Sequence, residues 1–343
     1  MRNSLLYSHL YSWYEANHRD LPWRETNDPY RIWLSEIILQ QTRVSQGLDY
    51  YFRFVNRWET VEALAAAKEE DVLREWQGLG YYTRARNLHK AAQMIVEHAW
   101  TPFPTRFEDI RSLPGVGEYT AGAIAAFAYN DAYLAMDGNV YRVLARLLDI
   151  DEPFDTIQGK KLFRQQAEKL LDREHPKLYN SAIMEFGALY CTPVLGDKCN
   201  DCPLQSICMA HIHGTAELLP VRKARPKVKD RWLDYHIYIL EENNILYTFL
   251  HQRSNPHDIW FHLYEFQCEE HSTPPATKDA KAISFTHVLS HQRLHARFFV
   301  HRIDSDKDIE SKLQDNIRIR WEDLEDFPFP RLLLRALEQL RVK

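Results

Sequence analysis

The chain contains 343 residues, of which 45% are hydrophobic and 27% are charged. This is a globular composition, and the length exceeds what one ordinary hydrophobic core organises, so we expect two domains. The formal net charge of −5, from 43 Lys and Arg against 48 Asp and Glu, is not typical of a nucleic-acid-binding protein, but local basic clusters at residues 84–90, 221–229 and 281–302 keep DNA binding open. The first residues lack the apolar run of a signal peptide, and the longest uncharged apolar stretch, residues 119–130, is too short to span a bilayer. We therefore expect a soluble, cytoplasmic protein.

Apolar residues recur at helical spacing from residue 4 to about residue 208, which predicts an all-α part. Within it, Glu36 shares a predicted helix face with Ile32, Trp33, Leu39 and Gln40, because residues three and four apart are neighbours on a helix. Burial among apolar side chains raises the pKa of a carboxyl group, which suits a general acid. The alternative is a structural glutamate paired with Lys or Arg.

Two glycine-containing turns precede predicted helices further along the chain. Pro114, Gly115 and Gly117 predict a tight hairpin that opens into a helix near Tyr119, where free backbone N–H groups could bind a phosphate. A plain connection is the alternative. About twenty residues later, Asp137 and Asn139 precede another apolar helix, and from the residues alone turn formation and N-capping account for both.

Four of the five cysteines lie within 18 residues, at the spacing C-x7-C-x2-C-x5-C: Cys191, Cys199, Cys202 and Cys208. In a reducing cytosol, such a cluster indicates a metal site more than disulfides. The spacing is compatible with a tetrahedral zinc ion and with an iron–sulfur cluster. We interpret the fifth, Cys268, as a small buried hydrophobic residue in a strand-like segment.

The helical pattern ends around Pro220. Residues 221–229 carry five positive charges and no negative charge, which predicts an exposed linker. Alternating runs of β-branched and aromatic residues follow at 232–240, 245–252 and 295–303, before a predicted helix at 331–340. The second domain is therefore predicted to be α+β.

Taken together, these motifs resemble the helix-hairpin-helix DNA glycosylases, and within them the MutY-type adenine DNA glycosylases over essentially the whole chain. The resemblance is carried by LPWR at 21–24, EIILQQTRV around Glu36, GLGYYTRARNL at 78–88, LPGVG at 113–117, DGNVYRVLAR from Asp137, and the cysteine cluster. It implies a multidomain fold: an all-α helix-hairpin-helix glycosylase domain at 1–213, with the hairpin at about 110–130 and an iron–sulfur loop at 191–208. A basic linker at 214–230 and an α+β, Nudix-like 8-oxoguanine recognition domain at 231–343 would follow.

The resemblance implies an adenine DNA glycosylase of base excision repair, which hydrolyses the N-glycosidic bond of adenine mispaired with 8-oxoguanine or guanine. Glu36 would protonate the leaving adenine and later handle the water, while Asp137 and Asn139 would stabilise the oxocarbenium-like sugar. Tyr119 stands where lyase members carry a lysine, and a phenol forms no Schiff base, so we expect a monofunctional enzyme. The alternatives are a bifunctional, endonuclease III-like lyase acting on oxidised pyrimidines and a non-catalytic mispair sensor.

The resemblance also assigns contacts to double-stranded DNA with A:8-oxoguanine or A:G mispairs. Trp23, Arg24, Ser181 and Glu185 would line the adenine pocket, with Ser181 standing where many relatives have Glu or Gln and Glu185 as a possible substitute. Gln41 and Tyr81 would be inserted into the duplex. The full set of DNA-binding residues is Gln41, Leu79, Tyr81, Arg84, Arg86, Gly115 and Gly117. The residues assigned to 8-oxoguanine recognition are His287, Leu289, Ser290 and His291, on a His-rich strand that would otherwise be expected simply to face solvent.

For the cofactor, the resemblance favours one structural 4Fe-4S cluster on the four clustered cysteines. The family has six residues in the first gap and this chain has seven, so we expect a bulge before Cys199. The second domain lacks the glutamate-rich metal helix of Nudix hydrolases, which favours a binding module. The resemblance further implies a monomer.

Overall fold

The computed structural model describes residues 2–100, 102–223, 228–275, 282–289, 291–305 and 315–340. The chain forms two compact units. One comprises Met1–Ala65 and Lys90–Ala224, and the other comprises Ala66–His89 and Arg225–Lys343. The first unit is helical and the second contains a β-sheet, as the hydrophobic patterns predict.

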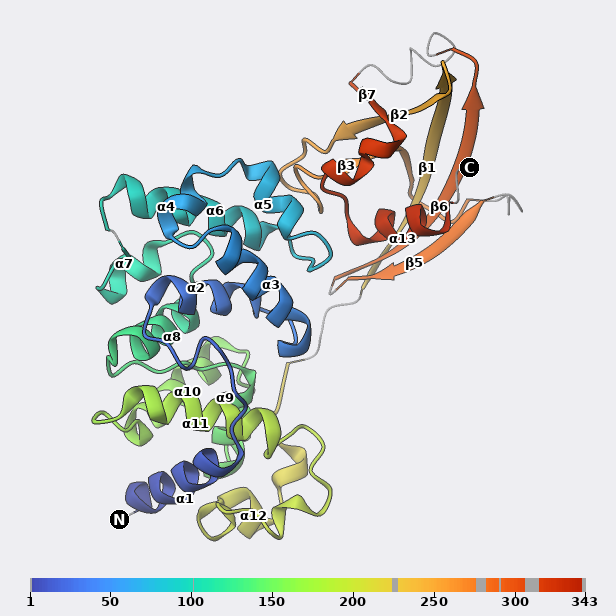
Figure 1. Ribbon diagram of the computed structural model, residues 1–343. Coiled ribbons are helices and arrows are strands. Elements are labelled where there is room, and N and C mark those ends of the chain that lie inside the picture. The colour runs from blue at the N-terminus through green and yellow to red at the C-terminus, as the bar shows by residue number, and fades with distance from the viewer. Residues whose placement is uncertain are drawn as a thin grey trace. The chain divides into compact units, whose positions relative to one another are not determined.

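Short turns join the helices of the first unit (Figure 1). The helices are α1 (Arg2–Asn17), α2 (Pro29–Ile38), α3 (Val44–Arg57), α4 (Val61–Ala66), the second half of α6 (Thr83–Glu97), α7 (Phe107–Ser112), α8 (Glu118–Tyr129), α9 (Gly138–Leu148), α10 (Ile157–Leu170), α11 (Pro176–Leu189) and α12 (Met209–His213). Short 3-10 turns lie at Gly196–Cys199, Gln205–Ile207 and Ala216–Leu218. Pro29 and Pro176 stand at the starts of α2 and α11, where a missing N–H costs no helical hydrogen bond.

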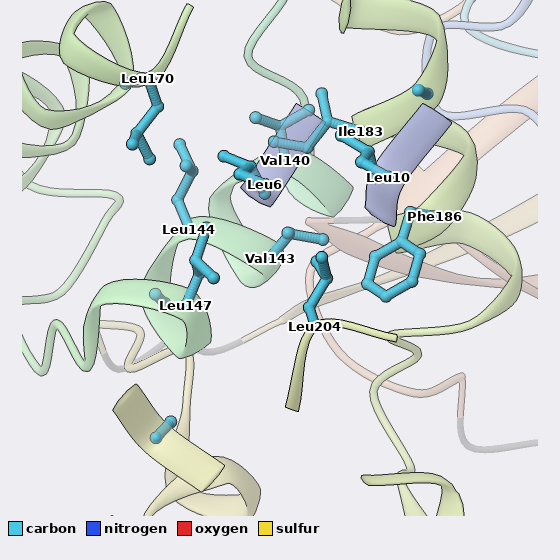
Figure 2. Packing of buried hydrophobic residues seen from close by; sticks show 14 of the residues in the cluster. Leu6, Leu10, Val140, Val143, Leu144, Leu147, Leu170, Ile183, Phe186 and Leu204 are labelled. Atoms are coloured by element: carbon cyan, nitrogen blue, oxygen red, sulfur yellow. The ribbon is translucent and has the colours of Figure 1, made fainter. Parts of the chain in front are cut away.

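The main core of this unit lies between α1, α9, α10 and α11. Figure 2 shows the leucine and valine side chains of α9 pointing toward residues of α1 and α11. The α9 residues Val140, Val143, Leu144 and Leu147 follow helical spacing and are nearly fully buried, as are Leu6, Leu10, Ile183 and Phe186. Full burial of one such side chain stabilises the fold by about 1.5–3 kcal/mol. Leu204 joins the same cluster, so the cysteine-containing loop is packed against α9.

The second unit is built on a seven-stranded sheet with the strand order β3-β2-β1-β6-β5. The strands are β1 (Lys229–Glu242), β2 (Ile245–Gln252), β3 (Tyr264–Glu265), β4 (Gln267–His271), β5 (Ile283–Val288), β6 (Gln292–Ile303) and β7 (Ile317–Arg320). β4 pairs with β1, and β7 pairs with β2. The helical parts of the unit are α5 (Glu69–Glu75), the first half of α6, η5 (Trp321–Asp326) and α13 (Arg331–Gln339).

Strand alternation places the core of the second unit on one face of its sheet. β1 and β6 run parallel, in register from Lys229 opposite Gln292 to Leu240 opposite Ile303. Their inward-facing residues pack with α13, and the cluster includes Leu233, Tyr235, Ile237, Leu294, Phe298, Leu332 and Leu333. Asn243 and Asn244 close the β1–β2 hairpin with φ of 52° and 64°, a left-handed conformation that asparagine tolerates in two-residue turns.

None of the helices among the described residues combines the length and the apolar composition needed to cross a membrane.

Candidate active site

A buried carboxylate lies on α2. The Asp28 side chain caps this helix by accepting the backbone N–H of Tyr30 at 2.9 Å. Helical periodicity then places Glu36 beside Ile32 and Trp33, both of which are fully buried, and Glu36 itself is only 4% exposed. The helix ends at Ile38, so Leu39 and Gln40 lie beyond the face on which the sequence pattern places them.

A cavity of about 550 Å³ opens over Glu36 within the first unit. Its volume falls in the range of small-molecule pockets. The residues predicted to be catalytic all line it: Glu36, Tyr119, Asp137 and Asn139. The residues predicted to contact adenine line the same cavity: Trp23, Arg24, Ser181 and Glu185. The fold thus brings together, around one cavity, residues that are up to 162 positions apart in the sequence, from Trp23 to Glu185.

Glu36 has two polar partners in this cavity. The Tyr119 hydroxyl donates a hydrogen bond to Glu36 Oε2 at 2.7 Å, and Arg24 Nη1 lies 3.5 Å from Glu36 Oε1. The Arg24 guanidinium also stacks on the ring of Phe127, 3.7 Å from its centroid. Burial raises the pKa of Glu36 and outweighs the lowering effects of Arg24 and Tyr119. Glu36 therefore holds a proton more tightly than an exposed glutamate.

Asp137 provides the second carboxylate of the cavity and caps α9. Its Oδ1 accepts the Val140 N–H at 2.8 Å, and its Oδ2 accepts Asn139 Nδ2 at 2.8 Å. N-capping, the role expected from the residues alone, is therefore present in the structure, but it does not remove Asp137 from the cavity wall. Burial also raises the pKa of Asp137, against the lowering effect of the hydrogen bonds from Val140 and Asn139.

Glu185 is a salt-bridged side chain at the edge of the cavity. The Arg19 guanidinium binds it through two hydrogen bonds, Nε to Oε1 at 2.6 Å and Nη2 to Oε2 at 2.8 Å. The backbone N–H of Arg19 also donates to Oε1 at 3.0 Å. Glu185 is 7% exposed and Ser181, one helical turn earlier on α11, is 6% exposed. The carboxylate is therefore held in a fixed orientation beside Ser181.

The predicted hairpin ends directly at the first turn of α8. Gly115 adopts a left-handed φ of 78°, which favours glycine, and Gly117 caps α8 without a side-chain hydrogen bond. Gln41, another predicted DNA-binding residue, also has a left-handed φ, of 55°, and it lines the cavity together with Gly117. The neighbouring Gln40 Nε2 donates to the Gly115 carbonyl at 3.4 Å, which links the two turns.

The four clustered cysteines line one pocket: Cys191, Cys199, Cys202 and Cys208. Burial raises the pKa values of three of these thiols, that of Cys202 to about 12, and neighbouring cysteines add to the effect. A bound metal would reverse this, because its positive charge favours thiolates. In the described part of the chain, no group of three Cys, His, Asp or Glu side chains is arranged to hold a single metal ion.

Two arginines of α9, absent from the sequence predictions, bind the cysteine loop, and one of them, Arg142, also contacts Asn139 in the cavity wall. Arg142 donates from Nε to the Cys191 carbonyl at 2.7 Å and from Nη2 to Asn139 Oδ1 at 2.9 Å. Arg146, 2% exposed, donates from Nη1 to Cys191 Sγ at 3.3 Å. The signal in the sequence was the placement of two arginines four residues apart within an apolar helix, where a buried charge requires specific partners.

Four predicted DNA-binding residues lie in the second unit: Leu79 and Tyr81 on the turn between α5 and α6, and Arg84 and Arg86 in the first turn of α6. Tyr81 is 46% exposed with a left-handed φ of 49°, whereas Leu79 is buried. Arg84 and Arg86 are 8% and 9% exposed, and both guanidiniums bond to backbone carbonyls of this unit. Their burial favours a role in holding the turn over direct contact with phosphates.

The residues predicted to recognise 8-oxoguanine lie at the end of β5 and just beyond it. His287 is half-buried, and its ring centroid lies 6.4 Å from that of Trp260. Burial, followed by Arg335 and Arg331, lowers the pKa of His287. Leu289 donates its N–H to the Gln292 carbonyl at 2.8 Å, and His291 is exposed. Ser290 lies outside the described residues.

Comparison with known sequences finds a base excision DNA repair family model and several adenine DNA glycosylases. Residues 34–173 match the family model "HhH-GPD superfamily base excision DNA repair protein". The chain is 44% identical over 212 residues to the adenine DNA glycosylase of Rattus norvegicus, covering 59% of this chain and 41% of that protein. With the adenine DNA glycosylases of two Buchnera aphidicola subspecies, it shares 35% identity over 74% of one relative's length (Baizongia pistaciae) and 31% over 96% of the other's (Acyrthosiphon pisum). These matches cover 78% and 96% of this chain.

Solved structures resemble the helical part. A thermostable thymine-DNA glycosylase aligns with a TM-score of 0.56 at 25% identity, covering 62% of this chain and 97% of its own. A trapped endonuclease III–DNA covalent intermediate aligns with a TM-score of 0.53 at 20% identity, covering 62% and 98%. At 20% sequence identity, the match to the endonuclease III structure shows a similar fold and nothing more. The chain spans less than half the length of the rat and mouse relatives, 41% and 45%.

Proposed function

Because this chain belongs to the adenine DNA glycosylase family of the HhH-GPD base excision repair superfamily, we propose that it hydrolyses the N-glycosidic bond of adenine paired with 8-oxoguanine or guanine in duplex DNA. One observation carries the proposal. The buried carboxyl of Glu36 and the carboxyl of Asp137 line a single cavity, with Tyr119 hydrogen-bonded to Glu36. A pair of carboxyl groups with different surroundings suits acid catalysis of glycosidic cleavage.

Glu36 acts as the general acid in this proposal. Its raised pKa keeps a proton available for the departing adenine, whose leaving ability depends on protonation. General acid catalysis typically supplies about 10²- to 10⁴-fold of the rate enhancement. As the base leaves, positive charge develops on the sugar, and Asp137, oriented by Val140 and Asn139, stabilises that charge. The deprotonated Glu36 then accepts a proton from the attacking water.

Tyr119 makes the reaction monofunctional in this proposal. Lyase chemistry needs an amine that attacks the sugar and forms a Schiff base, and the residue at this position is a phenol. Its hydroxyl also donates to Glu36, which supports a positioning role for Tyr119 in the hydrolytic site. Borohydride treatment during reaction with an abasic duplex tests the point: no covalent adduct is expected, and efficient trapping would favour the endonuclease III-like alternative.

The flipped adenine would occupy the cavity between Trp23, Arg24, Ser181 and Glu185. Trp23 is 1% exposed and supplies an apolar wall, while the Arg24 guanidinium is stacked on Phe127. Ser181 replaces the longer Glu or Gln of many relatives, and the Glu185 carboxylate is one helical turn away, held by Arg19. Since each carboxylate oxygen accepts more than one hydrogen bond, Glu185 retains capacity to accept the adenine amino group.

We further propose that the four clustered cysteines hold a 4Fe-4S cluster with a structural role. All four line one pocket, which suits either zinc or a polynuclear cluster, and the resemblance to the family favours the polynuclear cluster. Such a cluster would replace the thiol protons and fix the loop to α9 next to Arg146. Iron and sulfide analysis of anaerobically purified protein should find both, and zinc alone would contradict the assignment.

The remaining assignments rest on the family. We propose a glycosylase domain at 1–213, a linker at 214–230 and a Nudix-like 8-oxoguanine recognition domain at 231–343. His287, Leu289, Ser290 and His291 would contact the 8-oxoguanine, with the ring of Trp260 close to that of His287. Gln41 and Tyr81 would enter the duplex, and Gly115 and Gly117 would contact a phosphate. The protein would act as a cytoplasmic monomer on mispaired DNA.

Single-turnover release of adenine from a duplex with adenine opposite 8-oxoguanine tests the proposed function. The wild-type chain should release adenine, whereas Glu36→Gln should bind the duplex without releasing the base. A matched control is Glu97→Gln, which makes the same change at an exposed position on α6. Undiminished release by Glu36→Gln would refute the catalytic role, and duplex binding without any release by the wild type would favour the mispair-sensor alternative.

A further inference from the structure

The turn that carries Tyr81 is held in a conformation that needs external support. Gly78, Gly80 and Tyr81 all adopt left-handed φ values, of 93°, 79° and 49°. For a residue with a side chain, such a backbone conformation is strained and persists only where the surroundings impose it. Tyr81 is nevertheless 46% exposed, so its own side chain contributes little of that support.

Part of the support comes from within the turn. The Gly80 carbonyl, which belongs to the peptide bond before Tyr81, accepts hydrogen bonds from Trp76 Nε1 at 3.0 Å and from Arg84 Nη2 at 3.1 Å. The Arg84 guanidinium lies 5.6 Å from the ring centroid of Tyr81 and 5.1 Å from that of Trp76. These contacts fix the peptide and the root of the Tyr81 side chain.

The rest of the support comes from the C-terminal sheet, which forms one compact unit with residues 66–89. The Tyr82 hydroxyl donates to the Phe329 carbonyl at 3.0 Å and accepts the Gly78 N–H at 3.3 Å. Gln77 Oε1 accepts the Phe329 N–H at 3.2 Å, so both backbone groups of Phe329 bond to this segment. Phe329 is 1% exposed and stacks on Phe266. Hydrogen bonds of the buried Tyr82 hydroxyl therefore connect the turn to Phe329 in the core of the second unit.

A second anchor is the loop before β3. Arg86 Nη1 donates to the Phe261 carbonyl at 2.7 Å, and the guanidinium lies over the Phe261 ring. The next residue, His262, is hydrogen-bonded through Nδ1 to Glu69 at the start of α5. Trp260 and His262 have left-handed φ values of 64° and 66°, and the Trp260 ring packs near His287. One loop thus touches both the Tyr81 segment and the strand that carries the proposed 8-oxoguanine motif.

We propose that the C-terminal sheet unit positions Tyr81 for insertion into the duplex, with Tyr82 and Arg86 as the positioning residues. This inference rests on the proposed function, in which Tyr81 enters the base stack. It gives the C-terminal unit a second task besides contact with 8-oxoguanine, because the buried side chains of Tyr82 and Arg86 connect the turn that carries Tyr81 to that unit. The buried Tyr82 hydroxyl accepts a hydrogen bond from the turn and donates one to Phe329. A displacement of either segment is therefore expected to displace the other.

The first test needs no DNA. Tyr82→Phe removes the hydroxyl and keeps the ring, and Gln77→Met removes the bond to Phe329 at similar side-chain volume. Hydrogen exchange of the full chain, followed by mass spectrometry, should show faster exchange at residues 78–81 in both variants. The control is Tyr235→Phe, which removes a buried hydroxyl that bonds only within the sheet, to Glu265 at 3.3 Å. Exchange at 78–81 that is no faster in Tyr82→Phe than in Tyr235→Phe would overturn the inference.

The second test measures coupling to Tyr81. The probe is a duplex with a tetrahydrofuran abasic analogue opposite 8-oxoguanine, and the readout is its dissociation constant. Tyr82→Phe should weaken binding about 2- to 10-fold, which is the net effect of one buried hydrogen bond. In a Tyr81→Ala background the same change should have no further effect, because the wedge that it positions is gone. Equal losses in both backgrounds would show a general structural role and overturn the inference.

Failure of the proposed glycosylase function would give experimental results that differ from those expected if only the positioning inference fails. A wild-type chain that binds the duplex but releases no adenine refutes the glycosylase proposal, and the exchange and coupling measurements still decide the positioning role. A wild-type chain that binds no duplex would overturn both. Thermal unfolding of each variant identifies any global loss of structure, in which case the Gln77→Met variant takes the place of Tyr82→Phe.

Discussion

The hydroxyl of Tyr119 donates a 2.7 Å hydrogen bond to Glu36 Oε2, and this contact joins the first turn of α8 to the buried carboxyl of α2. Burial raises the pKa of Glu36, and the hydrogen bond from Tyr119 opposes that rise because it stabilises the charged form. Burial followed by the charge of Glu36 also raises the pKa of Tyr119, so the phenol keeps its proton. Glu36 therefore binds a proton more readily than an exposed glutamate, and Tyr119 is a fixed hydrogen-bond donor beside it.

Tyr119→Phe should shift the pH dependence of adenine release. Without the donated hydrogen bond, the charged form of Glu36 is less stable, so the pKa of Glu36 should rise further. A general acid works only while protonated, and the alkaline limb of the rate profile should therefore move to higher pH. Single-turnover rates between about pH 5 and pH 9 measure this directly. A profile with an unchanged alkaline limb would mean that Glu36 is not the titrating acid or that Tyr119 does not influence it.

Glu36→Gln should stabilise the fold increasingly as the pH rises. The pKa of Glu36 is higher in the folded chain than in the unfolded chain, where it is near the ordinary value of about 4.3. The stability contributed by the protonated form is fully present below the unfolded pKa and is lost as the pH rises through the folded pKa. Glutamine cannot ionise, so the difference in unfolding temperature between variant and wild type should grow above about pH 4.

Thermal unfolding at several pH values provides the measurement for this stability effect. The same substitution at the exposed Glu97 serves as the control and should give a difference that does not grow with pH. If Glu36→Gln instead destabilised the fold more strongly as the pH rises, the ionised carboxylate would be serving as a structural ion-pair partner of Arg24, in line with the Lys- or Arg-paired glutamate that was the alternative from sequence.

The position of Glu36 could be predicted because helical periodicity is a local property: its apolar neighbours three and four residues away are visible in the sequence. Its partners could not be predicted in that way. The hydrogen bond from Tyr119 to Glu36 joins residues 83 positions apart, and no local pattern specifies such a contact. The role of Tyr119 came from family resemblance, not from the physics of its neighbours.

In the second unit, too, local features were predicted from the sequence, whereas tertiary contacts were not. Alternating hydrophobicity predicted strands at 232–240, 245–252 and 295–303, and the structure has strands there. The parallel pairing of β1 with β6 and the packing of residues 66–89 with this sheet were not foreseen. Both depend on tertiary contacts between distant segments, such as Tyr82 with Phe329, whose sequence signals resemble those of any buried aromatic residue.

Arg142→Gln should weaken the link between the cysteine loop and the active site. Arg142 is 7% exposed and bonds to the carbonyls of Cys191 and Gly187 and to Asn139 Oδ1. Leaving buried acceptors without a donor costs about 1–3 kcal/mol each, so a loss of a few kcal/mol of unfolding free energy is expected. Because Asn139 orients Asp137, adenine release should slow as well.

Arg142→Lys separates the contribution of the positive charge at this position from that of the several hydrogen bonds made by the guanidinium. Lysine keeps the charge but lacks the fork of donors, so its unfolding free energy should fall between those of the wild type and Arg142→Gln. Denaturant unfolding, iron content and single-turnover rate should be measured on the same preparations. A glutamine variant with wild-type stability and rate would show that the bridge has no energetic role.

Glu185→Gln should reduce the preference for adenine over purine that lacks the amino group. The Arg19 guanidinium holds the Glu185 carboxylate beside Ser181, where many relatives place a longer polar side chain. If the carboxylate accepts the adenine amino group, neutralising it should slow adenine release by about 10- to 100-fold, because hydrogen bonds to charged groups contribute about 1.5–3 kcal/mol. Release of unsubstituted purine, which has no amino group to bind, should change much less.

The measurement for Glu185 is the ratio of single-turnover release rates for adenine and purine opposite 8-oxoguanine. Glu174→Gln, at an exposed position before α11, makes the same chemical change away from the cavity and should leave the ratio unaltered. If Glu185→Gln slowed the release of adenine and of purine equally, the Arg19–Glu185 pair would serve to stabilise the cavity wall and not to bind the amino group. In that case the Ser181 hydroxyl would be the acceptor to examine, since it is the neighbouring polar group on the same face of α11.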